Sequence, residues 1–353
     1  MGATVQFITY NEWLPAYGVD LDPYTGYDPT VDPSIANEFA TVGYRAHSMI
    51  HEDFEFIGDA DDYSQAELGA LEAQGITIEF NGDEIRFIIP LNVAFGRPHL
   101  LSEIGLGAAS LGLASDLQYT NDVFIDNQLR SVLFQIPAPG AENPMACLNG
   151  VDMPDCFTMV NDLGVLDMVR AYDHGIPHYN DLREAYGLER VNSFTDSTGE
   201  STQFFPSDPL IDPSDPINDP NIIDFVLLSN ANGDPVRVGD QNGGAVEGIQ
   251  RTTVAARLRN IYRSVDNVDA FTGMMAEPHV NGTEFGELQL AMWETQFTAM
   301  RDGDRFFYLN DPVLEMIEDE FDIDYRQTLA EVIANNTELS PKDLPSNVFL
   351  FGQ

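Results

Sequence analysis

The segment Asp32-Pro33-Ser34-Ile35-Ala36-Asn37-Glu38-Phe39-Ala40-Thr41-Val42-Gly43-Tyr44-Arg45-Ala46-His47-Ser48-Met49-Ile50 carries the most informative pattern of this chain. Asp is a residue type that caps helices, and a proline is tolerated in a first turn, where its missing N–H has no helical partner to lose. We therefore expect one amphipathic helix that starts near Asp32 and carries His47. Its apolar face consists of residues spaced three or four apart: Ile35, Phe39, Val42, Ala46 and Met49.

The rest of the chain predicts a mainly α fold with one short β-hairpin. Residues 3–14 have apolar side chains at helical spacing, and Pro15 is expected to end that helix. Residues 76–89 form two alternating apolar runs around Asn81-Gly82, which is a strong signal for a tight hairpin turn. Further helices are expected near residues 179–186, 248–262, 286–300 and 325–334.

No linker divides the chain, so residues 1–353 are interpreted as one domain. Asp-Pro dipeptides recur between residues 204 and 224 and predict an extended acidic, proline-rich loop. Cys147 and Cys156 could close a short disulfide loop, worth roughly 3 kcal/mol in the chain-entropy model and typical of an oxidising compartment. Two unpaired thiols are the alternative.

The charge of the chain excludes some partners. The formal net charge is −42 at pH 7, and Lys342 is the sole lysine. Phosphate groups are bound by clustered Lys and Arg, so nucleic acid and anionic membranes are not expected as partners. No apolar stretch is long enough to span a bilayer, and the first residues lack the pattern of a secretory signal.

Histidines are the candidates for metal chemistry. His47 and His51 have the spacing of a two-histidine zinc motif, but Ser48 stands where that motif has its general-base glutamate. A zinc site is therefore not favoured. By composition alone, a single histidine on a helix is more often structural than a metal ligand. The chain has six histidines: His47, His51, His99, His174, His178 and His279.

Several segments, in this order, resemble the animal haem peroxidase superfamily. Before His47 stands Val5-Gln6-Phe7-Ile8-Thr9-Tyr10-Asn11-Glu12-Trp13-Leu14-Pro15, and the block around it is Tyr44-Arg45-Ala46-His47-Ser48-Met49-Ile50. After it come Arg170-Ala171-Tyr172-Asp173-His174-Gly175-Ile176-Pro177, Val268-Asp269-Ala270-Phe271-Thr272-Gly273 and Arg301-Asp302-Gly303-Asp304-Arg305-Phe306-Phe307-Tyr308. The resemblance implies a helical peroxidase fold, a haem b with its iron, and oxidation of small donors with hydrogen peroxide.

By that resemblance, His47 is the proximal ligand of the haem iron. Asp167 takes the position of the residue that accepts a hydrogen bond from this histidine, where the family usually has Asn, and an exposed surface Asp is the alternative. Arg170 resembles the partner of a haem propionate, with a surface ion pair as the alternative. The family's Arg three residues before the histidine is replaced by Tyr44, which puts the role of Arg45 in doubt.

Other residues of the matching segments are interpreted as structural, because buried charges in such loops usually pair or cap helices. The family's distal His and Arg lie on segments that precede the matching part, so the catalytic residues of the distal side are expected outside this chain. The residues interpreted as structural are Asp173, His174, Arg301, Asp302 and Asp304.

Three functions follow from the resemblance. The first is a peroxidase whose N-terminal half is missing here, extracellular as family members are, and acting in the response to oxidative stress. The second is a truncated, non-catalytic haem-binding module. The third is a fatty-acid oxygenase, which would need a tyrosine beside the haem, with Tyr44 and Tyr172 as candidates.

Overall fold

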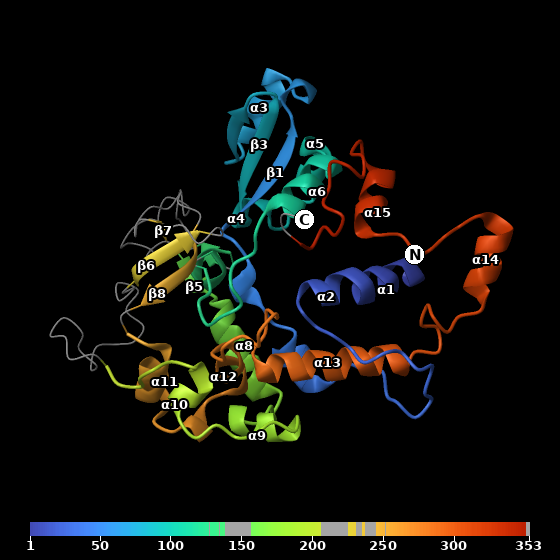
Figure 1. Ribbon diagram of the computed structural model, residues 1–353. Coiled ribbons are helices and arrows are strands. Elements are labelled where there is room, and N and C mark those ends of the chain that lie inside the picture. Colours follow the sequence, from blue (N-terminus) through green and yellow to red (C-terminus); the bar gives the residue numbers. More distant parts are fainter. Residues whose placement is uncertain are drawn as a thin grey trace.

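The computed structural model of the protein describes residues 1–126, 128–133, 135–137, 157–205, 225–230, 235–236, 245–250 and 252–350. Figure 1 shows a mainly helical molecule with small sheets at its periphery, as the sequence predicts. The α-helices are α1 (Gly2–Ile8), α2 (Leu14–Ala16), α3 (Gln65–Glu72), α4 (Leu91–Ala94), α5 (Leu100–Ile104), α6 (Leu106–Ser115), α8 (Leu163–Asp173), α9 (Tyr179–Ala185), α10 (Phe194–Thr198), α11 (Val254–Tyr262), α12 (Ala270–Met275), α13 (Glu287–Asp302), α14 (Val313–Phe321) and α15 (Leu329–Asn336).

Shorter helical turns and strands complete the fold. The π-helical turns are η1 (Thr9–Trp13), η2 (Phe39–Gly43) and η5 (Gln128–Val132), and the 3₁₀ turns are η3 (His47–Met49), η4 (Ala60–Asp62) and η7 (Val265–Asn267). The strands are β1 (Asp53–Asp59), β2 (Thr77–Asn81), β3 (Glu84–Pro90), β4 (Gln135–Pro137), β5 (Phe157–Val160), β6 (Phe225–Asn230), β7 (Pro235–Val236) and β8 (Ala245–Gln250).

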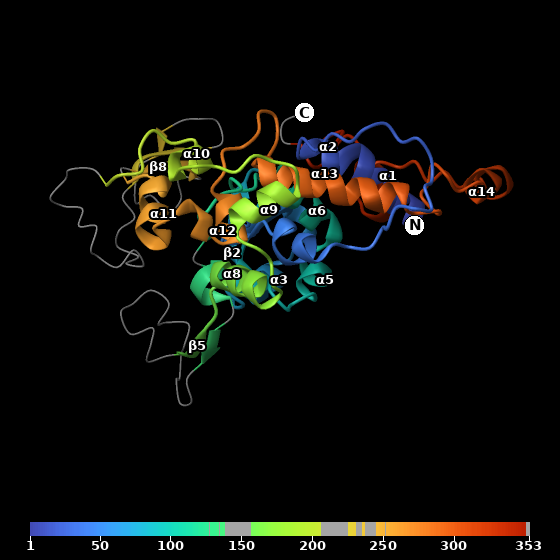
Figure 2. The same ribbon diagram turned by 90° about the horizontal axis from the view of Figure 1, so that it is seen from below.

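The main core forms around α13. The N-terminal helical segment α1-η1-α2 lies alongside α13, as Figures 1 and 2 both show. The Tyr10 hydroxyl donates a hydrogen bond of 2.9 Å to the carbonyl of Phe297 and joins the two. Complete burial of one large apolar side chain in this core stabilises the fold by about 1.5–3 kcal/mol. Buried side chains of α13 in this core are Leu288, Met292, Trp293 and Phe297.

The hairpin around Asn81-Gly82 is confirmed, but it belongs to a larger sheet. Strands β2 and β3 pair antiparallel, and β1 adds to the other side of β3. Helix α6 packs on β1 at Gly112, where a Cβ atom would lie only 1.9 Å from the carbonyl oxygen of Glu55. Only glycine permits this close approach. The additional strand β1 was not predicted, because it follows His47 and has no local turn signal.

Two helix boundaries also differ from expectation. The first helical segment continues past Pro15 to Ala16, since the Tyr17 N–H still bonds to the carbonyls of Trp13 and Leu14. The helix expected over residues 248–262 begins only at Val254, after strand β8, because the Thr253 side chain caps it by accepting from Ala256 N–H at 3.1 Å.

The other predicted helices are present. α9 and α13 lie where the sequence predicts them, and α15 begins a few residues late, after a capping box at Thr328 and Glu331. Cys147, Cys156 and residues 206–224 of the acidic loop lie outside the described residues. Within the described part of the chain, no helix is long and apolar enough to cross a membrane.

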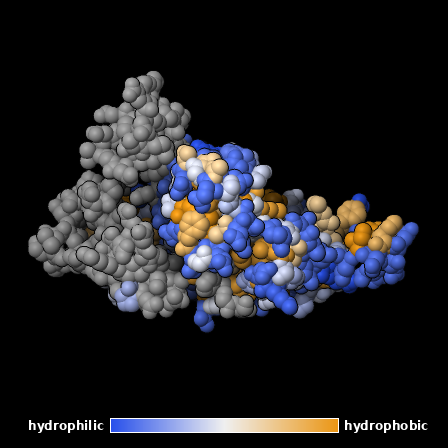
Figure 3. All heavy atoms as spheres, turned by 90° about the horizontal axis from the view of Figure 1, so that it is seen from above, coloured by the Kyte–Doolittle hydropathy of each residue, from blue (hydrophilic) through white to orange (hydrophobic). Residues whose placement is uncertain are grey.

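Hydrophilic residues dominate the coloured part of the face seen from above, with apolar patches between them (Figure 3). Helix α14 projects at one side of the molecule, at the right in Figure 1, with Val313, Met316 and Phe321 exposed. The outer face of α8 exposes Val165 and Val169 as well. Exposed apolar residues at helical spacing are typical of a surface that another polypeptide segment covers.

Candidate haem site

His47 does not lie on the long helix that its apolar spacing predicts. The helical segment ends at Gly43, and the backbone leaves helical geometry at Tyr44 (φ −97°, ψ 49°) and Ala46 (φ −137°, ψ 48°). His47 then begins the 3₁₀ turn η3.

Side chains of α13 explain where that helix ends. The Trp293 indole N–H donates to the Gly43 carbonyl at 2.8 Å, and the Gln289 amide donates to the same oxygen at 3.1 Å. These tertiary bonds satisfy a carbonyl that would otherwise need the next helical turn. The His47 side chain is released from the helix and turns toward α8.

A buried carboxylate receives His47. The Nδ1 atom of His47 lies 2.6 Å from Oδ2 of Asp167, and Asp167 is fully buried on α8. The surface-residue alternative for Asp167 is therefore wrong. An ionised carboxylate only accepts hydrogen bonds, so the proton of the neutral ring belongs on Nδ1. The lone pair is then on Nε2, where it can bind a metal.

Two arginines compensate the buried charge of Asp167. Arg170 NH1 donates to Oδ1 of Asp167 at 2.8 Å, one helical turn along α8. Arg45 Nε lies 3.9 Å from the same oxygen, and its NH2 group donates to the Ala40 carbonyl at 2.7 Å. Burial lowers the pKa of the Arg45 guanidinium, and the nearby positive charge of Arg170 adds to this effect, while Asp167 opposes it.

The structure thus brings together the three predicted site residues, His47, Asp167 and Arg170, from two distant parts of the sequence. The side chains of His47 and Arg170 are 22% and 32% exposed, so a planar ligand can approach both. A histidine with one nitrogen held by a carboxylate and the other available is the donor arrangement of a metal ligand with an oriented ring. These residues therefore fit a haem iron.

The other histidine of the pair is separated from this site. His51 Nδ1 lies 3.6 Å from Oδ2 of Asp116, and its ring packs on Tyr119 with centroids 4.0 Å apart. His47 and His51 thus contact different carboxylates in different surroundings, which agrees with the rejection of a two-histidine zinc motif.

Most of the residues interpreted as structural form hydrogen bonds or ion pairs that link parts of the fold. Arg301 is buried and donates to Asp302 Oδ1 and to the Asp22 carbonyl, each at 2.7 Å. Asp304 accepts from the Gln6 amide at 2.9 Å and so links the end of α13 to α1. His174 bonds to Asn37, whereas Asp173 is exposed at the end of α8.

One buried charge network was not predicted. Glu277 is buried and accepts from the Tyr179 hydroxyl at 2.6 Å, from the Leu288 N–H at 2.7 Å and from Arg183. Arg183 also binds Glu287 at 2.6 Å. Burial raises the pKa of Glu277, and the hydrogen bonds oppose this rise. The network joins α9 to the segment between α12 and α13, and no local pattern of charged residues predicted it.

Comparison with known proteins identifies the family of the chain. The family model for the animal haem peroxidase matches residues 1–205 and 244–349. Among curated relatives, Peroxinectin A of Dictyostelium discoideum is 28% identical over 334 residues, covering 94% of this chain and 45% of the relative. Thyroid peroxidase of Sus scrofa is 27% identical over 365 residues, covering 100% of this chain and 29% of the relative.

Solved structures show the same fold. Peroxidase A of Dictyostelium discoideum aligns with a TM-score of 0.62 at 26% identity and covers 98% of this chain and 49% of that one. A fatty acid alpha-dioxygenase of Arabidopsis thaliana aligns with a TM-score of 0.57 at 14% identity, with 98% and 48% coverage. The chain therefore spans less than half the length of these relatives. With the family model matching most of its residues, the chain belongs to the animal haem peroxidase family.

Proposed function

We propose that this chain provides the proximal side of a haem b peroxidase, with His47 as the iron ligand. The observation that carries the proposal is the 2.6 Å contact between His47 Nδ1 and the buried Asp167. When bound, the haem supplies an iron that reacts with hydrogen peroxide. The family shows the peroxidase type of chemistry, an oxidoreductase acting with peroxide and a reducing substrate.

Asp167 holds the proton of His47 on Nδ1 and fixes the direction of Nε2. Its negative charge draws that proton toward the carboxylate, which makes the ring a stronger electron donor and favours cleavage of the peroxide O–O bond. Arg170 uses one N–H on Asp167, and a guanidinium has five donors in a planar fork. The remaining donors suit a haem propionate.

The proposal also includes catalytic groups on the distal side of the haem. A distal His and Arg from a preceding segment would move the proton of the peroxide and stabilise the developing charge. Residues 1–353 then form the proximal half of one peroxidase domain. An extracellular location and a role in the response to oxidative stress complete the proposal, on the family resemblance.

The oxygenase alternative depends on a tyrosine beside the haem. Tyr172 is 86% exposed on the outer face of α8, whereas Tyr44 stacks on Trp293 with ring centroids 5.2 Å apart. Peroxidase function takes precedence, because the thyroid peroxidase at 27% identity and the solved Peroxidase A at 26% identity are named as peroxidases, whereas the dioxygenase is only 14% identical. Palmitate-dependent oxygen uptake by the haem-loaded protein, abolished in Tyr44→Phe, would reverse that order.

Haem titration tests the proposed ligand. Wild type, His47→Ala, His51→Ala and His174→Ala are compared by their Soret spectra. We expect the bound spectrum to be lost only in His47→Ala and to return on addition of imidazole, which can replace the missing side chain. An unchanged spectrum in His47→Ala, or loss in one of the two control variants instead, contradicts the proposal.

A further inference from the structure

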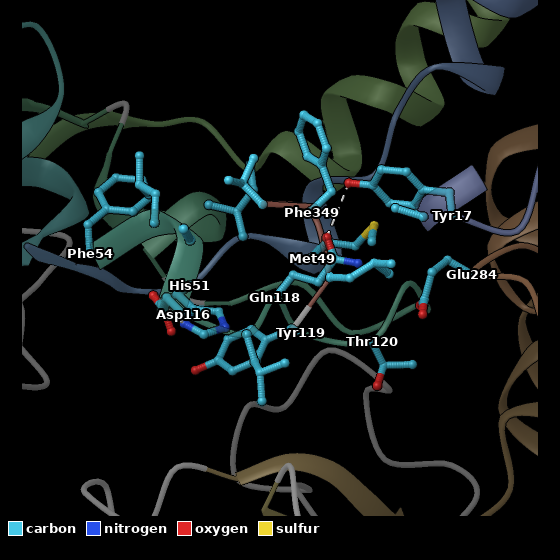
Figure 4. Close-up of a pocket in the computed structure, with 17 residues that line it drawn as sticks. Tyr17, Met49, His51, Phe54, Asp116, Gln118, Tyr119, Thr120, Glu284 and Phe349 are labelled. Atoms are coloured by element: carbon cyan, nitrogen blue, oxygen red, sulfur yellow. Dashed lines mark hydrogen bonds and ion pairs between the residues drawn. The ribbon is translucent and has the colours of Figure 1, made fainter. Parts of the chain in front are cut away.

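A hollow of about 690 Å³ lies on a part of the surface that His47 does not line. It is bordered by the end of α2, the segment after α6 and the C-terminal part of the chain. Figure 4 shows that aromatic and polar side chains face it together. The Tyr17 hydroxyl donates to Gln118 Oε1 at 3.2 Å at its edge. Lining residues include Tyr17, Phe54, Asp116, Gln118, Glu284 and Phe349.

Tyr17 also belongs to a connected series of aromatic ring contacts, called the ring stack below. Its ring centroid lies 5.5 Å from that of Trp13, which lies 5.2 Å from Trp293. Trp293 in turn stacks on Tyr44 at 5.2 Å with an interplanar angle of 29°. Trp and Tyr are the aromatic side chains that lose an electron most readily. Four such rings in contact form a route along which single electrons can move.

The opposite end of the stack, Tyr44, lies on the segment that leads to the proposed iron ligand. Tyr44 stands three residues before His47, and its neighbour Arg45 turns the other way toward Asp167. The Trp293 N–H holds the carbonyl of Gly43, directly before Tyr44. The segment that positions His47 is therefore joined to the ring stack by packing and by a hydrogen bond.

We propose that the stack Tyr44–Trp293–Trp13–Tyr17 is an electron relay between the haem site and a reducing substrate bound in the hollow beside Tyr17. The relay rests on the proposed function, which supplies hydrogen peroxide as the oxidant. In each turn the donor loses one electron to the rings and one proton, from its O–H or N–H group, to solvent. Two electrons and two protons convert one hydrogen peroxide into two water molecules.

The lining of the hollow selects the class of substrate. Apolar rings such as Phe54 and Phe349 favour an aromatic donor, and the Tyr17 ring offers a surface on which it can stack. Asp116 and Glu284 add negative charge to a protein whose net charge is −42. An uncharged phenol or an aromatic amine is therefore expected to bind, and an aromatic carboxylate is expected to be repelled.

Ligand binding is tested on the haem-free chain, which keeps this part independent of peroxide chemistry. Saturation-transfer NMR is used with 4-methylphenol and with 4-hydroxybenzoate, which share the phenol ring and differ in charge. We expect 4-methylphenol to bind at least tenfold more tightly. Leu113→Trp should block it, because Leu113 lines the hollow and is 54% exposed, so a larger side chain fills space without entering the core.

Electron movement is tested by finding where a radical forms. The test uses a longer, haem-loaded chain that adds the preceding distal segment, because residues 1–353 alone are expected to react with peroxide no faster than free haem does. This protein is treated with hydrogen peroxide and a nitroso spin trap, and the trapped residue is located by peptide mass spectrometry. We expect a Tyr17 adduct in wild type that falls at least fivefold in Tyr44→Phe and further in Trp13→Phe/Trp293→Phe. Each adduct yield is divided by the Soret absorbance of the same variant, because Trp293→Phe also removes the N–H that holds the Gly43 carbonyl. Phenylalanine is hard to oxidise, and in Tyr44→Phe it also keeps the six-membered ring. Tyr63→Phe is the matched control, since Tyr63 packs on Phe87 of strand β3 and takes part in none of the ring contacts of the relay.

The outcomes separate the relay from the proposed function. If His47→Ala leaves the Soret spectrum unchanged, the iron ligand is wrong. If the spectrum depends on His47 but no Tyr17 adduct forms, or the adduct persists in both relay variants at the level of Tyr63→Phe, the relay is refuted. Binding of 4-methylphenol that is unaffected by Leu113→Trp, or no tighter than that of 4-hydroxybenzoate, refutes the substrate site. Circular dichroism establishes that each variant is folded.

Discussion

His47 Nδ1 lies 2.6 Å from Oδ2 of Asp167, a carboxylate that is completely removed from solvent. Burying a charge is unfavourable unless it is paired, and here the pairing comes from Arg170, Arg45 and the histidine ring. The interaction orients the ring and sets its electron donation, and this makes it the first target for mutation.

Asp167→Asn should raise the reduction potential of the bound haem iron and weaken haem binding by about tenfold or more. The amide keeps the size of the side chain but removes the negative charge that strengthens His47 as a donor. Spectroelectrochemical titration and haem affinity give the two readouts. Asp173→Asn is the control, since Asp173 is exposed at the end of the same helix. No shift, or a downward shift, would remove Asp167 from the site.

Glu277→Gln should lower the free energy of unfolding by about 3 kcal/mol or more. The substitution leaves Arg183 buried without its charged partner, and breaking such a pair typically costs 3–5 kcal/mol. Urea denaturation followed by circular dichroism measures the change. Glu287→Gln removes the other carboxylate on Arg183, which is 59% exposed, and should cost under about 1 kcal/mol. Equal effects of the two variants would mean that burial of Glu277 is not what matters.

Asp53→Asn should stabilise the protein at pH 8 by about 1 kcal/mol and have little effect near pH 4. Burial raises the pKa of Asp53 to about 6, and the charge of Glu52 adds to the rise. Because the folded pKa lies above the unfolded one, ionisation between pH 4 and pH 6 disfavours the folded state. Wild type should therefore gain more stability than the variant when pH falls from 8 to 5.

Unfolding curves at pH 5 and pH 8 test this, with the surface variant Asp61→Asn as the control for the general loss of negative charge. The prediction is wrong if Asp53→Asn and Asp61→Asn respond to pH in the same way.

Haem-loaded chain 1–353 should oxidise guaiacol no faster than free haem does. The proposed distal His and Arg are not among its motifs, and removing such groups usually costs several orders of magnitude in rate. A longer chain that adds the preceding distal segment should restore turnover and cover apolar residues such as Val165 and Val169. Initial rates and light scattering measure both effects. Turnover at an enzymatic rate by residues 1–353 alone would refute the assignment of the distal residues to another segment.

Local sequence signals determined much of this protein. The Asn81-Gly82 turn fixed a hairpin, because glycine adopts the positive φ of 68° that the turn needs. Apolar spacing predicted α9 and α13, and the order of the motifs identified the family and indicated His47 as the proposed iron ligand. These features depend on residues that are close in sequence, or on sequence motifs that can be recognised without the structure.

Tertiary structure alone decided the rest. Trp293, 250 residues away in sequence, bonds to Gly43 and ends the helix that periodicity extends to His47. The burial of Asp167, the pairing of β1 and the ring stack from Tyr44 to Tyr17 arise in the same way. Each depends on a contact between residues far apart in the sequence, and this contact forms only when the core around α13 assembles. No local pattern of residues predicts such a contact.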